Sequence, residues 1–349
     1  MSCCSNQSEY YDYLRSLGGL PLGFKASVSS LTFLPRERPS EEPYRMNIAA
    51  VVASEPCSSF AGVFTKNAVP GAPVLIGRKR LEKAAMHGIL VNNRISNVAA
   101  RDGQAAALRL TAAAETILGI DPGSLFPSST GIIGWQLPED EMLKALPGLL
   151  EPLKGHGSDA SRAAAVDSAA ETVRDPANET AAETARKPGA SPESADSLLA
   201  FARAIMTTDS YPKIRVRKVG RGRIVGVVKG AGMIEPDMAT MLGFIFTDLQ
   251  VPRDALREIL KEAVDCSFNR ISVDSDQSTS DMVLAFSSGK IGVELEEFQR
   301  EFTELCRDLS MDIVRNGEGT AHVMDIEVCG SQDPRLSREI GKAVANSPL

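Results

Sequence analysis

The stretch at residues 229–248, KGAGMIEPDMATMLGFIFTD, combines a lysine, closely spaced glycines, threonines and an apolar run. Gly230 and Gly232 leave two interpretations open. One is a phosphate-binding loop, because glycine lets backbone N–H groups approach an anion. The spacing GAG is not GxGxxG, however, and no clear helix pattern follows it. The other interpretation, a tight turn that leads into a buried strand, fits these residues better.

Asp274, Asp276 and Asp281 form an acidic cluster further along the chain. A calcium loop would also need a glycine and a terminal glutamate at set positions, and both are missing here. We therefore expect no metal ion, and we expect these aspartates to shape a turn near the site of chemistry.

The cysteines and histidines offer little chemistry by their spacing. No two cysteines form a CxxC pair, and no histidine is spaced to complete a zinc site with them. We expect reduced, mostly buried thiols. The histidines are isolated from one another, so a histidine-based triad has no local support. The residues concerned are Cys3, Cys4, Cys57, Cys266, Cys306, Cys329, His87, His156 and His322.

Motifs spread along the chain resemble those of one enzyme family, and they occur in the family's order. They are PLGF at 21–24, AGVFTKN at 61–67 followed by APV, SSTGIIG at 128–134, MTTDSYPK at 206–213, ATML at 239–242, NRISVDSDQSTSD at 269–281 and IVRNGEGTAH at 313–322. On these motifs the chain resembles the glutamate/ornithine N-acetyltransferases, which cut their own chain. The resemblance covers about residues 20–150 and 198–349.

The resemblance implies cleavage between Ala239 and Thr240, with Thr240 as the nucleophile. A threonine hydroxyl is a weak nucleophile unless a nearby base takes its proton. Release of Thr240 as a new N-terminus would supply an α-amino group with a pKa of about 7.7–8.0, which suits a general base. The same hydroxyl can first attack the carbonyl of Ala239, so self-cleavage and catalysis use one nucleophile.

The resemblance also assigns the groups around that nucleophile. The Thr130 hydroxyl and the Gly131 N–H would stabilise the tetrahedral oxyanion, although SSTGIIG by itself is typical of a plain turn. Thr207, Lys229 and Glu318 would hold the amino-acid part of the substrate together with Thr240. A cation suits an α-carboxylate and a carboxylate suits an amine, whereas taken singly Lys229 and Glu318 are typical surface charges.

The implied reaction is a double displacement in arginine biosynthesis. Acetyl would pass from N-acetylornithine to the threonine and then to glutamate, with acetyl-CoA as a possible further donor and with no metal or nucleotide cofactor. The two cleaved pieces, α and β, would associate as a heterotetramer of two α and two β. Two alternatives stay open: a threonine-nucleophile hydrolase of the aminopeptidase kind, and an inactive truncated remnant.

The chain departs from the family pattern at several positions. NNRISNVAARDG at 92–103 carries Arg94 and Arg101 where the family has glycines, and arginine adopts positive φ only at a cost, so we expect this loop to have a different shape. Ser275 and Ser280 replace a glycine and an asparagine, and Asn316 and His322 are also unusual. The chain stops at ANSPL, inside a motif that the family continues, so the resemblance implies that a C-terminal segment with two substrate contacts is missing.

Periodicity and breakers predict a mixed α/β (α+β) fold, a layered sandwich of helices and largely antiparallel sheets. We expect 46–53 and 61–67 to be strands of one sheet, and 213–229 to be a hairpin that turns at 220–222. The basic run Arg215, Arg217, Lys218 on that hairpin is typical of a solvated strand face, with steering of an anionic substrate or nucleic-acid binding as alternatives. Further strands are expected at 89–93, 270–274, 282–286 and 323–329, and helices at 79–88, 104–118, 198–206, 253–264, 296–309 and 334–345.

Composition sets the domain boundaries and the class of protein. Residues 155–196 number 42 and include 12 alanines but no Leu, Ile, Met or Phe, so they cannot build a core. We therefore expect an N-terminal part at 1–154, a low-complexity insertion at 155–197 and a nucleophile-bearing part at 198–349. A net charge of -7 argues against nucleic-acid and membrane-surface binding, and the first residues lack a secretory signal, so we expect a cytoplasmic location.

Overall fold

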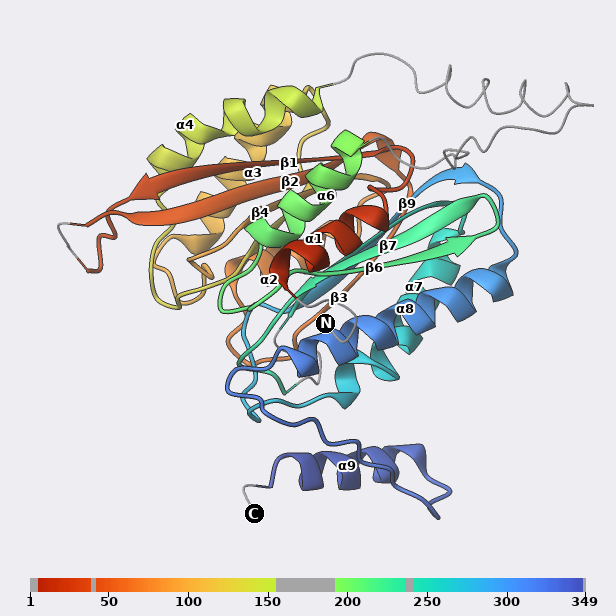
Figure 1. Ribbon diagram of the computed structural model, residues 1–349. Helices are drawn as coiled ribbons and strands as arrows, with labels where there is room; N and C mark the ends of the chain where they lie inside the picture. Colours follow the sequence, from red (N-terminus) through yellow and green to blue (C-terminus); the bar gives the residue numbers. More distant parts are fainter. Residues whose placement is uncertain (1–5, 39–41, 155–191, 236–240, 348–349) are drawn as a thin grey trace, which may run out of the picture.

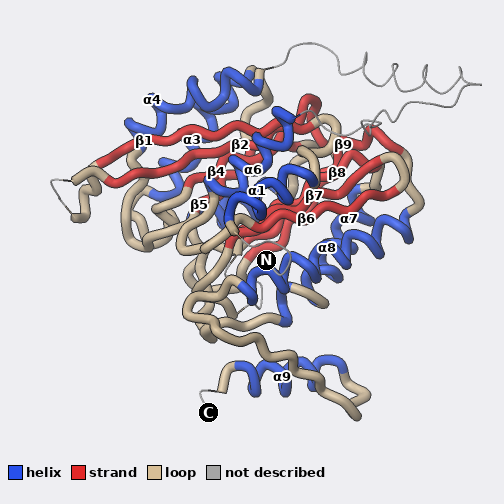
Figure 2. Tube along the Cα trace, viewed as in Figure 1, coloured by secondary structure: helices blue, strands red, loops and turns tan. Residues whose placement is uncertain are grey.

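The computed structural model describes residues 6–38, 42–154, 192–235 and 241–347, and it consists of two β-sheets stacked between helices (Figures 1 and 2). The first sheet has the order β1-β2-β4-β5 and the second has the order β3-β9-β8-β7-β6. All neighbouring strands are antiparallel except two pairs, β4 with β5 and β8 with β9. The expected layered sandwich with largely antiparallel sheets is confirmed.

Nine strands carry these sheets among the described residues. They are β1 (Phe24–Phe33), β2 (Tyr44–Cys57), β3 (Ser59–Phe64), β4 (Met86–Asn92), β5 (Leu125–Ser129), β6 (Lys213–Val219), β7 (Gly222–Lys229), β8 (Leu242–Leu249) and β9 (Met282–Ile291). Strands β4, β5 and β8 are buried along their whole length, because a sheet or helices cover both of their faces. The expected hairpin at 213–229 is present as β6 and β7.

The helices lie mainly on the outer faces of the two sheets. They are α1 (Gln7–Ser16), α2 (Ala72–Arg80), α3 (Gly103–Leu118), α4 (Glu139–Leu150), α6 (Pro192–Ala204), α7 (Arg253–Asp265), α8 (Leu295–Arg315) and α9 (Pro334–Ala345), with short 3-10 turns at Glu151–Leu153 and Phe268–Arg270. Helices α3 and α4 cover the first sheet, and α7 and α8 cover the second (Figure 1). The helices expected at 104–118, 253–264 and 334–345 are confirmed, and α8 is longer than expected.

The fold has four layers, which are the two sheets and the helices on the outer face of each. Three apolar layers hold them together. The central layer lies between the sheets, where Val51 and Phe126 of the first sheet pack with Phe246 and Phe286 of the second. A second layer joins the second sheet to α7 and α8, and a third joins the first sheet to α3 and α4. Since burial of apolar area is the main stabilising term, these layers fix how the ends of the two sheets meet.

The assignment of β2 and β3 to one sheet was wrong. The chain passes from the first sheet to the second across Ser58, so β2 pairs with β1 and β4, whereas β3 pairs only with β9. Alternation along a strand shows which face is buried, but it carries no information about the partner. The pairing of Phe60 with Phe286 joins segments that are far apart in the sequence.

Four other local expectations were wrong. The helix expected at 79–88 is α2 at Ala72–Arg80, because Pro73 begins a helix rather than interrupting the chain, and Met86–Asn92 is a strand. Residues 270–274 and 323–329 form no strand; the latter run along the surface, with Met324 72% exposed. Helix α6 begins at Pro192, six residues before the expected start at 198.

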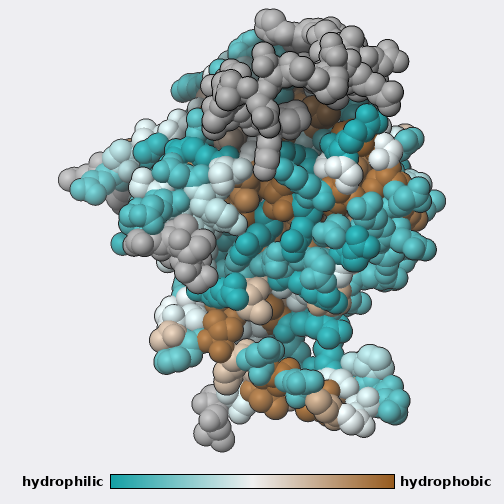
Figure 3. Space-filling view, turned by 45° about the vertical axis from the view of Figure 1, so that its right-hand side comes forward, coloured by the Kyte–Doolittle hydropathy of each residue, from teal (hydrophilic) through white to brown (hydrophobic). Residues whose placement is uncertain are grey.

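Helix α9 lies apart from the two sheets (Figure 1) and has no buried residue. Its side chains Leu336, Ile340 and Val344 are exposed, and apolar side chains show at this end of the molecule in Figure 3. Polar contacts hold it, including a hydrogen bond of 2.9 Å from Lys342 to Glu235. None of the described helices is both long and apolar enough to cross a membrane.

Candidate active site

Lys229 and Thr130 meet where the two sheets end on the same side. Lys229 is the last residue of β7 in the second sheet, and Thr130 directly follows β5 in the first. The Lys229 Nζ donates a hydrogen bond of 3.1 Å to the Thr130 hydroxyl oxygen, and both residues are buried. A lysine that is 8% exposed and bonded to a threonine is not a solvated surface charge.

The loop that carries Thr130 is held by the loop after β4. The Thr130 N–H donates to the Asn92 carbonyl over 3.1 Å, and the Ile132 N–H donates to the Arg94 carbonyl over 2.9 Å. Gly131 lies between them with φ 127°, and a Cβ atom there would lie 2.2 Å from the Arg94 carbonyl carbon. Only glycine fits this close approach, and within the described chain the Gly131 N–H donates no hydrogen bond. Its N–H therefore remains available to a bound group.

Arg94 adopts the left-handed conformation that its side chain was expected to prevent. Its φ is 70°, so the expectation that an arginine would keep this position out of the left-handed region was wrong. The conformation costs about 1–2 kcal/mol for a residue with a Cβ. Two contacts hold it: the Arg94 carbonyl accepts from Ile132, and its Nε donates to the Arg45 carbonyl over 3.1 Å. Ser275 behaves similarly with φ 61°.

Thr207 reaches the same site through a buried carboxylate. It lies on the loop after α6, where its N–H donates to Asp209 over 3.1 Å. The other oxygen of Asp209 accepts the N–H of Gly230 over 2.8 Å, directly beside Lys229. The Thr207 side chain is exposed at this point. Asp209 thus links the loop of Thr207 to the turn that directly follows Lys229, although the two lie on different elements.

Glu318 lies against the glycines of the GAG turn. It follows α8, and its N–H donates to the Ala231 carbonyl over 2.7 Å. A Cβ atom on Gly232 would lie 2.6 Å from the Glu318 carboxyl group, so a side chain at position 232 would displace this carboxylate. GAG is therefore a turn that accommodates a neighbouring carboxylate, which agrees with the turn interpretation.

The three aspartates of the acidic cluster have different surroundings. Asp274 accepts the backbone N–H groups of Met233 and Ile234, and so shapes the turn after the GAG segment. Asp281 is 3% exposed and is hydrogen-bonded to the Ser278 side chain and the Met241 N–H, while its Oδ2 atom has no partner among the described residues. Burial raises the pKa of Asp281 well above its ordinary range. No group of three or more possible metal ligands lies together in the described ranges.

Ala239 and Thr240 lie outside the described residues, and Met241 is the first described residue after them. The other predicted residues lie at the end of β7 and on loops that contact one another; they are Thr130, Gly131, Thr207, Lys229 and Glu318. Sequence reasoning missed the buried charges Asp209 and Lys213. They stand in MTTDSYPK, but only burial separates them from ordinary surface charges.

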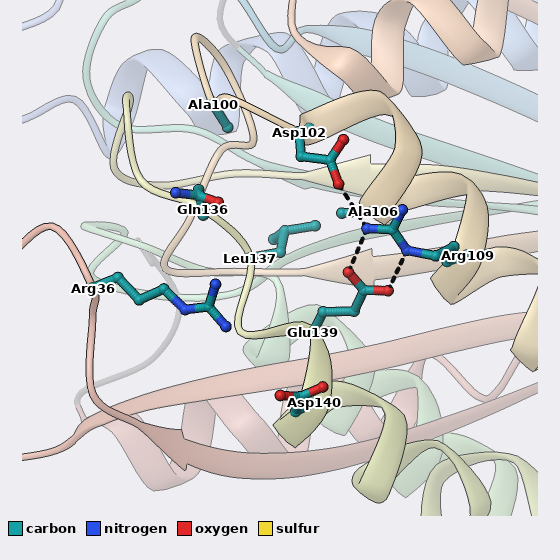
Figure 4. Close-up of a pocket in the computed structure, with 10 residues that line it drawn as sticks. Arg36, Ala100, Asp102, Ala106, Arg109, Gln136, Leu137, Glu139 and Asp140 are labelled. Carbon is teal, nitrogen blue, oxygen red and sulfur yellow. Dashed lines mark hydrogen bonds and ion pairs between the residues drawn. The ribbon is translucent and has the colours of Figure 1, made fainter.

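A pocket on another part of the surface contains none of these residues (Figure 4). It lies at the beginning of α3 and has a volume of about 150 Å³. Arg109 donates there to Asp102 over 2.7 Å and to Glu139 over 2.6 Å. Three of its charged side chains are thus paired with one another, and none of the predicted site residues lies there.

The two-sheet α/β fold, with a hydroxyl, a lysine and an accessible backbone N–H at its sheet ends, defines an enzyme with a polar site suited to a developing negative charge. The sequence profile of the ArgJ family matches residues 40–349. The chain therefore belongs to the ArgJ family, and the resemblance seen in its motifs is confirmed.

Two curated relatives and one solved structure illustrate the similarity. The arginine biosynthesis bifunctional protein ArgJ 2 of Clostridium acetobutylicum is 36% identical over 301 residues, which are 86% of this chain and 67% of that protein. The ArgJ protein of Rhodococcoides fascians is 36% identical over 307 residues, covering 87% of this chain and 65% of that one. The chain thus spans about two thirds of the length of these relatives. A structure of ornithine acetyltransferase from Mycobacterium tuberculosis with ornithine is 23% identical, with a TM-score of 0.40, and covers 63% of this chain and 96% of that chain.

Proposed function

We propose that this chain is an acetyltransferase of arginine biosynthesis that moves acetyl from N-acetylornithine to glutamate through an ester on Thr240. Membership of the ArgJ family supports the reaction class. The observation that carries the proposal at the level of residues is the buried hydrogen bond from Lys229 to Thr130, beside the available N–H of Gly131.

In the first step Thr240 processes the chain. Its hydroxyl attacks the Ala239 carbonyl carbon, the C–N bond of the peptide breaks, and the nitrogen of Thr240 takes the proton. Water then hydrolyses the resulting ester, which leaves a carboxylate on Ala239 and a free hydroxyl and α-amino group on Thr240. The new α-amino group can act as the general base for that hydroxyl.

Thr130 and Gly131 serve the oxyanion that forms in each step. Because the Thr130 oxygen accepts a hydrogen bond from Lys229, its own hydrogen is available for donation to a developing negative charge. The positive charge of Lys229 strengthens that donor. The Gly131 N–H supplies the second donor, in a position that the contact with Arg94 holds rigidly.

In the transfer reaction the Thr240 hydroxyl attacks the acetyl carbonyl of N-acetylornithine, and its proton passes to the α-amino group. The C–N bond breaks, the proton moves to the departing amine, and ornithine leaves. The amine of glutamate then attacks the acetyl ester, which forms N-acetylglutamate and restores the hydroxyl. Lys229 would pair with a substrate carboxylate, Glu318 with a substrate amine, and Thr207 would position the amino acid.

An assay of the purified chain with N-acetylornithine and glutamate tests the proposal. Formation of N-acetylglutamate, dependent on Thr240, is the expected result. Release of acetate without N-acetylglutamate would instead identify a hydrolase, and no reaction with either acceptor would contradict the proposal. Replacing N-acetylornithine by acetyl-CoA shows whether the second donor is used.

The assembly and the absence of a cofactor belong to the same proposal. We expect the pieces 1–239 and 240–349 to stay associated as two α and two β chains, which native mass spectrometry measures. The chemistry uses a hydroxyl and an amine, so dialysis against a chelator should leave the rate unchanged. A cytoplasmic location, expected from the sequence, stays a prediction that fractionation tests.

A further inference from the structure

We propose that Asp209, Lys213 and Asn316 form a buried polar junction that positions the substrate-holding residues, an inference that rests on the proposed function. Lys213 lies on β6 and is 0% exposed. Its Nζ donates 2.6 Å hydrogen bonds to Asp209 and to Asn316. Asp209 and Asn316 are buried as well.

The junction ties together three backbone segments that belong to different elements. Asp209 accepts the N–H of Thr207 over 3.1 Å, from the loop after α6, and the N–H of Gly230 over 2.8 Å, from the turn after β7. Asn316 is the C-cap residue of α8 and accepts the N–H of Ser210 over 3.2 Å. Lys213 bridges the two acceptors, so a shift of any of these segments would break a hydrogen bond to Asp209 or Asn316 or pull one of these acceptors away from Lys213.

Each of these segments carries a residue that the proposed function assigns to the substrate. Thr207 is itself bonded to Asp209. Lys229 precedes Gly230, so the Gly230 bond sets where the lysine side chain begins its reach to Thr130. Glu318 follows Asn316 by two residues and is bonded to Ala231 of the same turn. The junction therefore orients the three substrate-holding side chains relative to one another.

Stability alone does not explain why charged groups occupy this place. A buried ion pair often stabilises a fold no better than apolar side chains of similar volume, whereas removal of one partner leaves a costly unpaired charge. Burial lowers the pKa of Lys213, and Asp209 opposes that shift. Burial alone would raise the pKa of Asp209, but Lys213, Lys229 and the hydrogen bonds to the carboxylate lower it. The Lys213 Nζ donates to the Asp209 carboxylate over 2.6 Å, and that carboxylate offers its two oxygens to two backbone segments.

The first experiment measures hydrogen exchange in the unliganded chain for Asp209→Asn and for a matched control. Asp248→Asn is the control, because Asp248 is also buried and accepts the N–H groups of Leu22 and Arg223, which carry no substrate-holding residue. We expect Asp209→Asn to speed exchange by about tenfold at 205–210, 229–232 and 314–318 together. The control should leave these three segments as in the parent.

The second experiment separates positioning from folding. Asp209→Asn should raise the KM for N-acetylornithine about tenfold or more with a smaller change in kcat, because substrate-holding groups move while Thr240 remains. The double variant Asp209→Asn, Lys213→Met removes both charges. We expect its thermal stability to recover towards the parent's while its KM stays raised, since no unpaired charge remains but the junction is lost.

The outcomes decide the junction separately from the proposed function. A parent without acetyl transfer counts against the proposed function alone, and the exchange pattern still decides the junction. The proposed junction would be overturned if Asp209→Asn and Asp248→Asn raised the hydrogen-exchange rate of the three segments equally, or if Asp209→Asn left that rate unchanged. It would also be overturned if, in the double variant, the KM for N-acetylornithine returned to the parent's value together with the thermal stability. If Asp209→Asn does not fold, Asn316→Ala takes its place, because it leaves no buried acid without a partner. This variant should raise the hydrogen-exchange rate at 207–213 and 314–318.

Discussion

Lys229 donates a hydrogen bond to the hydroxyl of Thr130 over 3.1 Å, although Lys229 ends a strand of the second sheet and Thr130 follows a strand of the first. The bond forms because the central apolar layer stacks the ends of β5 and β7 on the same side of the molecule. It leaves the hydrogen of the Thr130 hydroxyl free to point at a reacting oxygen. Five measurable consequences follow from this site and its surroundings.

Thr130→Ala should slow acetyl transfer about 10²-fold, since it removes one oxyanion donor. Thr130→Ser keeps the hydroxyl and should retain most of the rate. Thr116→Ala, an exposed threonine on α3, is the control for threonine loss and should match the parent. Steady-state kcat measures all three, and a Thr130→Ala rate within about twofold of the parent would sink the assignment.

Lys229→Met should raise the KM for N-acetylornithine by about ten- to a hundredfold, because a charged hydrogen bond to a carboxylate is worth about 1.5–3 kcal/mol. Lys229→Arg keeps the charge and should be less affected. Lys218→Met, at an exposed position on β6, removes a lysine away from the site and should leave KM unchanged. An unchanged KM in Lys229→Met would show that the lysine does not hold substrate.

Expression of the chain should yield two pieces, 1–239 and 240–349, in place of one 37.3 kDa chain. The attack is intramolecular and needs no bound substrate, so cleavage precedes any assay. Thr240→Ala lacks the hydroxyl and should remain whole, whereas Thr240→Ser should still cut. Intact mass spectrometry distinguishes the products, and cleavage of Thr240→Ala would contradict the nucleophile.

The buried carboxyl of Asp281 should make stability fall as pH rises. Burial raises its folded pKa well above the unfolded value of about 3.9, so its stabilising contribution is complete below that value and is lost as pH rises towards the folded pKa. Asp281→Asn should flatten this decline. Asp248, whose pKa burial also raises, adds a contribution of the same sign, so some decline should remain.

Urea unfolding across a pH series measures this effect, and a Thr240→Ala background keeps the chain uncut. The comparison is between the slopes of unfolding free energy against pH. If the curves of unfolding free energy against pH have the same slope with and without Asp281→Asn from about pH 4 upwards, the carboxyl does not titrate as described.

Thiol labelling should follow burial. Cys329 is exposed and should react within minutes, whereas Cys57 and Cys306 are buried and should react only after unfolding. Burial also raises the pKa of Cys57 to about 12 and that of Cys306 well above its ordinary range, which removes the reactive thiolate. Peptide mass spectrometry after alkylation at pH 8 reads out each site. Rapid labelling of Cys306 in the folded chain would contradict its place between the second sheet and α7 and α8.

Much of the local structure follows from the residues themselves. The alternation of basic residues with valines in β6 and the spacing of apolar residues in α7 predict their type, and α7 buries its apolar stripe against the second sheet. The ordered motifs suffice to predict the family, which the match over residues 40–349 confirms. The positions of Thr130, Gly131 and Lys229 could likewise be named as candidates from the motifs.

Only the tertiary structure decides which candidates meet and in what surroundings. Strand periodicity predicts which face of a strand is buried but not which strand is its partner. The chain passes from β2 in the first sheet to β3 in the second because of packing between distant segments. The same packing brings Lys229 and Thr130 together. A lysine in a sequence is typically a surface charge, yet Lys213 is fully buried because Asp209 and Asn316 supply its partners. Arg94 takes a left-handed conformation for the same reason: contacts from elsewhere in the chain outweigh its local preference.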